Sequence, residues 1–220
     1  MLLKSVFIGF LSFHSVDTPI LKECKTEADK ISGCIEKKYD SNVDLWIETP
    51  YKNGKVDGIA KEYYEKGKLA SETPYKNGKR EGIEKLYYES GDLGAEIPYK
   101  NDKFEGTTKQ YYENGNLEFE IPYKNNKREG MLKWYYENGN LKEEIPYKNG
   151  KTHGDVKYYT ENGKLLALVK AENKFISGKC FNNKVLTDKE LRNLKDFEIA
   201  YLFDDVINYL QEICLKSDSK

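Results

Sequence analysis

Glutamate is the residue type whose spacing in this sequence comes closest to a catalytic pattern. Glu65 and its equivalents at steps of 24 residues supply carboxylates at regular intervals. A pair of carboxylates can cleave a glycosidic bond when one protonates the leaving oxygen and the other acts as base or nucleophile. That chemistry requires two carboxylates in different environments, whereas repeated positions on a flat sheet share one environment and offer no concave pocket. The sequence therefore predicts a protein that is not an enzyme.

Other catalytic and metal-binding residues are scarce. The chain has two histidines, His14 and His153, and its four cysteines form no CxxC pair. The sequence contains no G-x-S-x-G, no H-E-x-x-H and no P-loop. We therefore expect no metal site and no cofactor.

The four cysteines lie in two pairs, one near each end of the chain. Cys24 and Cys34 are near the N-terminus, and Cys180 and Cys214 are near the C-terminus. An even number of cysteines in a chain that we expect to be exported is typical of disulfides. We predict Cys24–Cys34 and Cys180–Cys214, because the residues between the two pairs would hold them far apart. The alternative is a pair of unlinked buried thiols at each end.

Between the cysteine pairs the sequence repeats itself every 24 residues, and such periodicity is the mark of a repeat architecture. The tripeptide Pro-Tyr-Lys begins at Pro50, Pro74, Pro98, Pro122 and Pro146. Glycines keep the same step at Gly58, Gly82, Gly106, Gly130 and Gly154, and a second series runs from Gly67 to Gly163. Weaker copies flank these units, so the array extends from about residue 36 to about residue 184.

Each unit carries two strand signals and two turn signals. In the first unit, residues 59–65 and 69–75 are β-prone, and Lys66-Gly67 separates them. This turn becomes Asn-Gly in three later units, and Asn53-Gly54 starts the equivalent series at the other end. Asn-Gly favours tight hairpin turns in which both central residues have positive φ. We predict a mainly β protein, a single-layer antiparallel sheet that grows by roughly 10 Å per unit to about 50–60 Å.

The full repeat, G-x-x-K-x-Y-Y-E-N-G-x-L-x-x-E-I-P-Y-K-N-G-K, resembles the bacterial variant of the MORN repeat. The resemblance covers about 145 of the 220 residues. It implies stacked β-hairpins that act as a scaffold. Many bacterial members of that family are labelled antitoxins of toxin–antitoxin pairs, so the resemblance also implies neutralisation of a toxin. Similar eukaryotic MORN proteins are linked to membranes and to protein assembly.

Some positions never change between the units, and these should be structural. Lys61, Tyr63 and Glu65 keep their identity in every unit, and their alternation places them on one face of a strand. The tyrosines are predicted to form a structural ladder of Tyr63, Tyr87, Tyr111, Tyr135 and Tyr159. The alternative is a tyrosine track that binds a glycan or a peptide.

Other positions change from unit to unit and lie on the opposite face. This face becomes more apolar toward the C-terminal end of the array, and an exposed cluster with Trp and Tyr is typical of a protein-binding site. The predicted partner-binding residues are Leu86, Gln110, Leu132, Trp134, Val156 and Tyr158. The alternative is that a C-terminal helix covers this end of the face.

The two ends of the chain differ from the repeats. Lys4 precedes an apolar run from Val6 to Phe13, which has the length of a signal-peptide core. At the other end Thr187 and Glu190 match a capping box, and apolar residues then recur at helical spacing. We expect one amphipathic helix over about 188–215, with a break allowed near Asp196. The predicted segments are a signal peptide (1–15), an N-terminal cap (16–35), the repeat array (36–184) and a C-terminal helical cap (185–220).

Composition limits the partners. Lys and Arg number 36 and Asp and Glu number 37, so the chain lacks the basic excess that nucleic acid requires, and acidic residues on the C-terminal helix make membrane association unfavourable. Our first hypothesis is a protein-binding scaffold in the periplasm or outside the cell, and neutralisation of a toxin is one concrete version of it. The alternatives are an envelope- or glycan-associated structural protein and a cytosolic antitoxin. Exposed sheet edges would also allow self-association.

Overall fold

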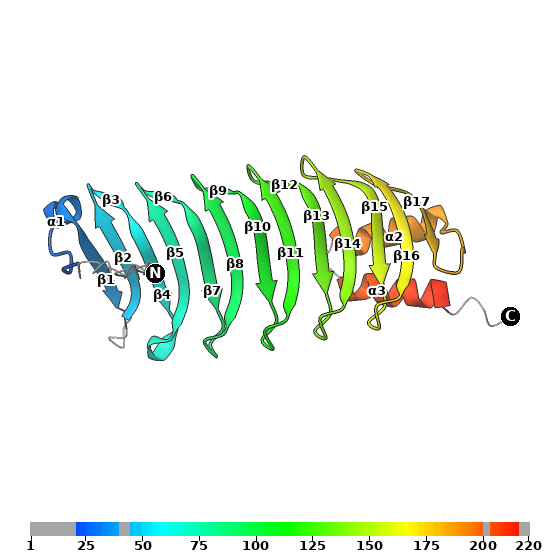
Figure 1. Cartoon of the computed structure of the whole chain (residues 1–220), viewed down its shortest axis with the longest axis horizontal. Coiled ribbons are helices and arrows are strands. Elements are labelled where there is room, and N and C mark those ends of the chain that lie inside the picture. The colour runs from blue at the N-terminus through cyan, green and yellow to red at the C-terminus, as the bar shows by residue number, and fades with distance from the viewer. Residues whose placement is uncertain (1–20, 40–44, 200–202, 216–220) are drawn as a thin grey trace, which may run out of the picture.

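The computed structural model describes residues 21–39, 45–199 and 203–215. In these residues seventeen strands form one elongated antiparallel sheet, with helices at both ends (Figure 1). The mainly β, single-layer fold expected from the repeats is confirmed. The predicted signal peptide lies outside the described residues. No helix within them is long and apolar enough to cross a membrane.

The longer strands form hairpins, each of which pairs with the next along the chain. These hairpins are β1 (Cys34–Tyr39) with β2 (Leu45–Lys52), β4 (Gly58–Tyr63) with β5 (Leu69–Lys76), β7 (Gly82–Tyr87) with β8 (Leu93–Lys100), β10 (Gly106–Tyr111) with β11 (Leu117–Lys124), β13 (Gly130–Tyr135) with β14 (Leu141–Lys148), and β15 (Lys151–Tyr159) with β16 (Leu165–Glu172). Four two-residue strands lead from one hairpin to the next, namely β3 (Lys55–Val56), β6 (Lys79–Arg80), β9 (Lys103–Phe104) and β12 (Lys127–Arg128), and β17 (Phe175–Cys180) ends the sheet.

The two turns differ in conformation in every repeat but the first, in which Lys66 and Gly67 both have positive φ, 66° and 75°. Asn53 and Gly54 both have positive φ, 51° and 71°, as a tight hairpin turn requires. In the Asn114-Gly115 turn only the glycine has positive φ (84°). The Asn114 side chain instead accepts a hydrogen bond from the N–H of Asn116 at 2.8 Å. The expectation that both central residues have positive φ is therefore wrong for Asn114-Gly115, where asparagine serves as a side-chain acceptor.

The recurring proline and glycine are structural partners. Gly106 has a φ of 118°, and a Cβ atom there would lie 3.0 Å from Cγ of Pro98. The Pro98 carbonyl accepts the N–H of Glu105 at 3.1 Å, just before the glycine. The proline ring thus occupies the space that any larger residue at the glycine position would need, which explains why both series keep the same step.

Alternation along the strands gives the sheet two distinct faces. We call the one that carries Lys61, Tyr63 and their equivalents the ladder face. The opposite one, which carries Ala60, Glu62 and their equivalents, is called the helix face. Two C-terminal helices, α2 (Asp188–Ile199) and α3 (Phe203–Leu215), lie side by side on the helix face behind strands β13–β17 (Figure 1).

The sequence predicted one helix over about 188–215 with a break allowed near Asp196, and the structure has two helices, the first of which ends at Ile199. The apolar residues of the cap were correctly assigned to a helix, and Leu194 and Leu210 are buried in the core that the sheet contributes with Val156 and Val169. A hairpin of two shorter helices lets both apolar stripes pack on the same part of the sheet. Helix α2 ends at Ile199 and helix α3 begins at Phe203. The sequence between them has neither glycine nor proline.

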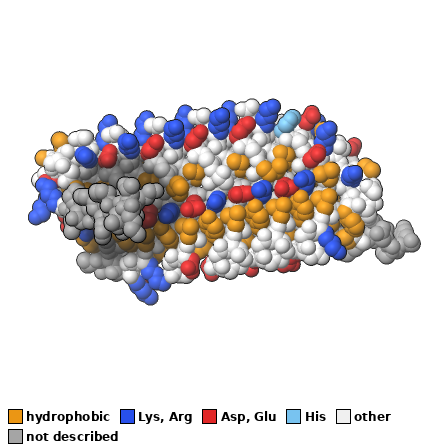
Figure 2. Space-filling model, viewed as in Figure 1, with side chains coloured by type: hydrophobic (Ala, Val, Ile, Leu, Met, Phe, Trp, Pro, Cys, Tyr) orange, Lys and Arg blue, Asp and Glu red, His pale blue; other side chains and the backbone are white. Residues whose placement is uncertain are grey.

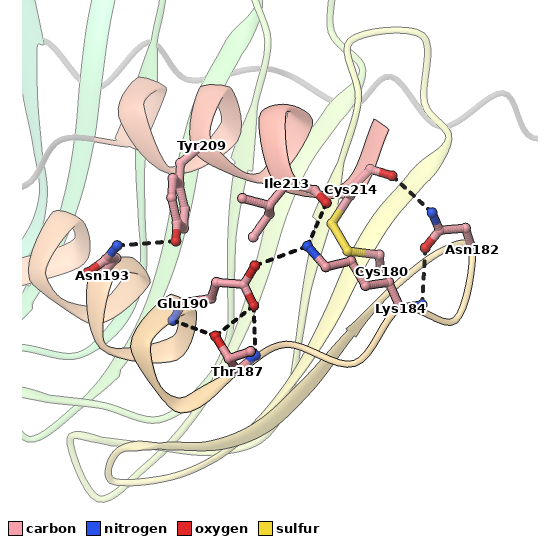
Figure 3. Close-up of polar contacts among 9 residues, drawn as sticks. All are labelled: Cys180, Asn182, Lys184, Thr187, Glu190, Asn193, Tyr209, Ile213 and Cys214. Atoms are coloured by element: carbon pink, nitrogen blue, oxygen red, sulfur yellow. Dashed lines mark hydrogen bonds and ion pairs between the residues drawn. A yellow bond between two sulfur atoms is a disulfide. The ribbon is translucent and has the colours of Figure 1, made fainter. Parts of the chain in front are cut away.

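Polar contacts and a disulfide join this cap to the last strands (Figure 3). The capping box is confirmed, since Glu190 accepts the Thr187 N–H at 2.7 Å and donates its own N–H to Thr187 Oγ1 at 3.3 Å. Lys184 Nζ contacts both Glu190 Oε1 at 3.0 Å and the Ile213 carbonyl at 2.9 Å. Burial raises the pKa of the Glu190 carboxyl, but these hydrogen bonds outweigh it and hold the pKa below its usual range.

Both disulfides predicted from the sequence are present, Cys24–Cys34 and Cys180–Cys214. One disulfide ties the segment around Cys24 to β1, and the other ties α3 to β17. At the N-terminal end the Cys24 N–H donates to the Ile35 carbonyl of β1 at 2.9 Å. Helix α1 (Glu27–Ser32) connects this segment to β1. At the C-terminal end the N–H of Leu186 donates to the Gly178 carbonyl at 2.9 Å. Both outer strands are thus partly paired along their free edges.

Candidate functional site

The tyrosine ladder joins successive repeats through hydrogen bonds. Each ladder hydroxyl donates to a glutamate fifteen residues earlier, in the preceding repeat. The oxygen–oxygen distances are 2.9 Å for Tyr63–Glu48, 3.1 Å for Tyr87–Glu72, 3.0 Å for Tyr111–Glu96, 3.2 Å for Tyr135–Glu120 and 2.9 Å for Tyr159–Glu144. Because these hydroxyls are already used within the sheet, the geometry supports the structural role expected for the ladder.

A row of alternating charges runs along the ladder face beside the tyrosines (Figure 2). Strand register places each inner lysine between two glutamates and each end lysine beside one, in the order Lys37, Glu48, Lys61, Glu72, Lys85, Glu96, Lys109, Glu120, Lys133, Glu144 and Lys157. Lys157 lies 3.0 Å from Glu144. Burial works to raise the Glu144 pKa, and hydrogen bonds from Lys157 and Tyr159 outweigh it and lower the pKa. With six lysines and five glutamates the row is close to neutral, and it offers little surplus charge for an ionic partner.

Half of the residues predicted to bind a partner are covered. Leu132 is 2% exposed, and Val156 and Tyr158 are fully buried. They belong to the core that includes Leu194 of α2 and Leu210 of α3. The prediction that these three residues are accessible to a partner is wrong, because the chain's own helices pack on the most apolar end of the helix face. For these three residues the alternative, that a C-terminal helix covers this end of the face, is confirmed.

The other three predicted residues lie where the helices end or beyond them. Leu86 is 37% exposed, and Gln110 donates to Glu118 Oε2 at 2.7 Å. Trp134 is half-buried, and its ring centroid lies 4.6 Å from that of Phe119. The structure thus leaves part of the predicted surface open, on repeats two to four.

A groove opens on the helix face next to the start of α3. Its volume is about 1070 Å³. It is lined by Tyr112, Glu118, Phe119, Ile121, Arg128, Leu132, Trp134, Tyr136, Glu137, Lys142, Ile145, Tyr147, Glu161 and Asp204. The sequence identified Leu132 and Trp134, but the binding residues predicted from it do not include Tyr112 or Tyr136, which belong to a column with tyrosine in four of the five units. The variable column Ala70, Gly94, Glu118, Lys142 and Leu166 was the signal that could have revealed the groove.

Two tyrosines on the groove wall are held by backbone hydrogen bonds. The Tyr112 hydroxyl donates to the Tyr135 carbonyl and that of Tyr136 to the Tyr159 carbonyl, each at 2.7 Å. Burial, and then the negative charge of nearby carboxylates, raises the pKa of both Tyr112 and Tyr136 to about 12. Asp204 contributes in both cases. The groove therefore combines fixed aromatic rings with a negative potential.

Two cations in the groove are already engaged. Lys142 Nζ lies 2.5 Å from Asp204 and 5.5 Å from the ring centroid of Tyr136. Arg128 donates to the Tyr147 hydroxyl at 3.0 Å and lies 5.1 Å from that ring. Both show how this surface accommodates a positive charge, between an aromatic ring and an oxygen.

No group of three His, Cys, Asp or Glu side chains in the part of the chain that the structure describes is arranged to hold a metal. Each row glutamate that receives a ladder hydroxyl has the same kind of neighbours, a tyrosine from the next repeat and a lysine beside it. Such repeated carboxylates do not provide the unlike acid and base that hydrolysis requires.

Fold and surface together define a class of protein, a β-hairpin repeat scaffold built for binding. A family model for the MORN repeat variant matches five segments, 56–77, 80–101, 104–125, 128–149 and 152–173, which together make up half of the chain. The chain belongs to the MORN repeat variant family. A search of the curated proteins finds no match.

Proposed function

We propose that this chain is a non-enzymatic scaffold whose partner, a protein, docks on the helix face between β7 and β14. One observation carries the proposal. Helices α2 and α3 cover the C-terminal end of this face, and the groove opens where their cover stops. The chain thus provides its own example of what packs on this surface, namely an amphipathic element.

The same chemistry continues from the covered part of the face to the open part. One column of the helix face reads Thr73, Ile97, Ile121, Ile145 and Val169. Val169 lies in the core beneath the helices, and Ile121 and Ile145 line the groove. An apolar stripe with aromatic neighbours and polar edges has the composition of a protein interface. We therefore expect the partner to present an amphipathic segment with a continuous apolar side.

Two variants on one strand test this proposal. Leu86 on the helix face and Ile83 on the ladder face are 37% and 51% exposed, and both lie in β7. We expect Leu86→Asp to lose proteins that the unchanged chain captures from extracts of its native host, because a charge would be buried in the interface. Ile83→Asp, the matched control, should retain them. Capture that is equal for both variants, or lost only with Ile83→Asp, contradicts the proposed surface.

We also propose that the protein acts in an oxidising compartment, in the cell envelope or outside the cell. The two disulfides and the apolar run Val6–Phe13 support this. Intact mass of the native protein, with alkylation in the absence of reductant, tests the location. Loss of about fifteen N-terminal residues, the length expected of a signal peptide, with no alkylated cysteine fits export. A full-length chain with four alkylated thiols contradicts it and favours the cytosolic antitoxin.

Neutralising a toxin is one concrete form of such binding, and it is supported by the family resemblance alone. The glycan-associated alternative would use the ladder face. It has less support, because the ladder hydroxyls that would bind sugar are already donated to glutamates such as Glu96 and Glu120.

A further inference from the structure

Comparison of two neighbouring repeats shows a difference inside the groove. In the fourth repeat Lys142 lies over the ring of Tyr136 and pairs with Asp204. In the third repeat the equivalent ring is Tyr112, and the position equivalent to Lys142 is Glu118. The equivalent tyrosine rings therefore have glutamate at the neighbouring position in the third repeat and lysine in the fourth.

The charges around Tyr112 are negative. Glu118 and Glu137 both act on the Tyr112 hydroxyl, and with burial they raise its pKa to about 12. Gln110 donates a hydrogen bond to Glu118, but a neutral amide does not cancel the charge of the carboxylate. The groove as a whole is lined by four carboxylates and two cations, and both cations are held by the oxygens described above.

We propose that the groove takes a basic side chain, lysine or arginine, carried by an amphipathic segment of the protein partner. The cation would lie against the ring of Tyr112 and between the carboxylates of Glu118 and Glu137, as Lys142 lies between Tyr136 and Asp204. Apolar residues of the same segment would pack on Phe119 and Ile121. The inference rests on the proposed function and adds the chemistry of the partner.

Three features of the surface support this choice of partner. Cations bind favourably over the face of an aromatic ring, more so when the site is shielded from water. A volume of about 1070 Å³ exceeds the needs of one side chain and suits a peptide segment. The groove is also continuous with the interface that α2 and α3 make with the sheet, because Leu132 belongs to both.

Synthetic amphipathic peptides with the same leucine face test the inference. Their polar faces carry only lysine, only glutamine or only glutamate, and their affinity for the oxidised full chain is measured by titration calorimetry at low salt. We expect the lysine peptide to bind at least about tenfold more tightly than the glutamine peptide, and the glutamate peptide more weakly still. Added salt should reduce the preference for lysine.

Two charge-reversal variants identify the site. Glu118→Lys should weaken binding of the lysine peptide by about tenfold, and the milder Glu118→Gln should weaken it less. The fold should tolerate Glu118→Lys, because the next repeat already has lysine at that position. Glu62→Lys is the matched control, since it makes the same charge change on the same face two repeats away. It should leave the affinity unchanged.

The outcomes separate this inference from the proposed function. Equal affinity for the lysine and glutamine peptides overturns the basic anchor, as does an equal loss of affinity in Glu62→Lys and Glu118→Lys. If Leu86→Asp still abolishes capture of the natural partner in that case, the docking surface stands without the anchor. If Leu86→Asp has no effect on capture, the surface itself is wrong.

Discussion

Each ladder tyrosine crosses one repeat boundary, so a single hydroxyl contributes to the cohesion of two repeats. The Tyr111 hydroxyl, for example, leaves β10 and reaches Glu96 in the preceding hairpin. A second hydroxyl series crosses the boundary in the other direction on the helix face, as Tyr112 does toward the Tyr135 carbonyl. The twin tyrosines of the first four repeats therefore bind to both neighbours, one on each face of the sheet, whereas the fifth repeat has Thr160 at the second position.

Removal of one ladder hydroxyl should lower stability without changing binding. We expect Tyr111→Phe to reduce the free energy of unfolding by about 1 kcal/mol, the usual contribution of one hydrogen bond. Urea unfolding measures this loss, and affinity for the lysine peptide should stay unchanged. Lost binding with unchanged stability would instead assign the ladder a direct role in recognition.

The contact between proline and glycine can be isolated with two alanine variants. Gly106→Ala places a Cβ atom 3.0 Å from Pro98 Cγ at a φ of 118°. Gly115→Ala meets no atom within 4 Å, although its φ is also positive. Both variants should incur backbone strain, and we expect Gly106→Ala to be less stable than Gly115→Ala by about 1–3 kcal/mol because of the added overlap. Equal melting temperatures would show that the proline ring moves aside freely.

The tyrosines also predict how stability depends on alkaline pH. Burial, followed by neighbouring carboxylates, raises the pKa of Tyr63 and of Tyr112 to about 12 in the folded protein. A raised pKa means that the folded state favours the neutral phenol, so this stabilisation is complete below about pH 10 and is lost between about pH 10 and pH 12. Circular dichroism and phenolate absorbance should show unfolding in that window. Full phenolate formation with an intact sheet would contradict the assigned burial.

At this scale the sequence predicted the contacts that follow from the repeats or from the order of the cysteines, and it missed those made by the C-terminal helices. The ladder and both disulfides followed from position within a repeat or from order along the chain. The burial of Val156 and Tyr158 depended instead on where α2 and α3 pack, and repeat spacing contains no information about that. The groove was missed for the same reason, since Asp204 comes from outside the repeats.

At the scale of elements, the helical cap is held to the sheet by packing and by one disulfide. Cys214 in α3 is joined to Cys180 in β17, and Asn182 Nδ2 donates to the Cys214 carbonyl at 3.1 Å. These contacts fix the end of α3 that is farther from the groove. Lys142 and Asp204 fix the other end.

Removal of this disulfide should loosen the cap locally. We expect the double variant Cys180→Ala and Cys214→Ala to lose about 2–4 kcal/mol of stability, with faster amide hydrogen exchange in α2 and α3. The matched control replaces Cys24 and Cys34 with alanine. It should leave exchange in α3 unchanged, because the repeat array separates the two ends. Equal loosening of α3 in both variants would contradict independent caps.

The sequence predicted the strands and the helical character of the cap, but not the path of the cap. Periodicity identified the strands because each hairpin has the same pattern of turns and apolar residues. The division of the cap into two helices has no glycine or proline to mark it. It follows from packing on the sheet, which lets both α2 and α3 bury their apolar sides against β14–β17.

At the scale of the whole molecule, each repeat contacts mainly its neighbours, so length and stability should depend on the number of repeats. Deletion of residues 82–105 removes one complete repeat and joins equivalent positions. We expect a folded protein that is shorter by about 10 Å, with a lower melting temperature and a smaller denaturant m-value. Small-angle scattering and urea unfolding measure these changes. An unfolded product would show that the repeats are not interchangeable.

The charge row makes the same deletion informative about register. Removal of a whole repeat keeps every lysine beside a glutamate. Removal of one strand, for example residues 94–106, would place Lys109 opposite Lys85 in the register that the β7 hairpin has now. Like charges directly opposite each other destabilise a sheet, so this second deletion should be far less stable than the first.

The partly paired outer edges affect how readily copies of the chain could join end to end. A sheet with two free edges is an open-ended polymer, and its length would vary with how many copies are present. Here the segments near Cys24 and Leu186 occupy backbone groups of the outer strands, so part of each edge cannot pair with another copy of the chain. The length of the sheet in one chain therefore depends on the number of repeats that its gene encodes.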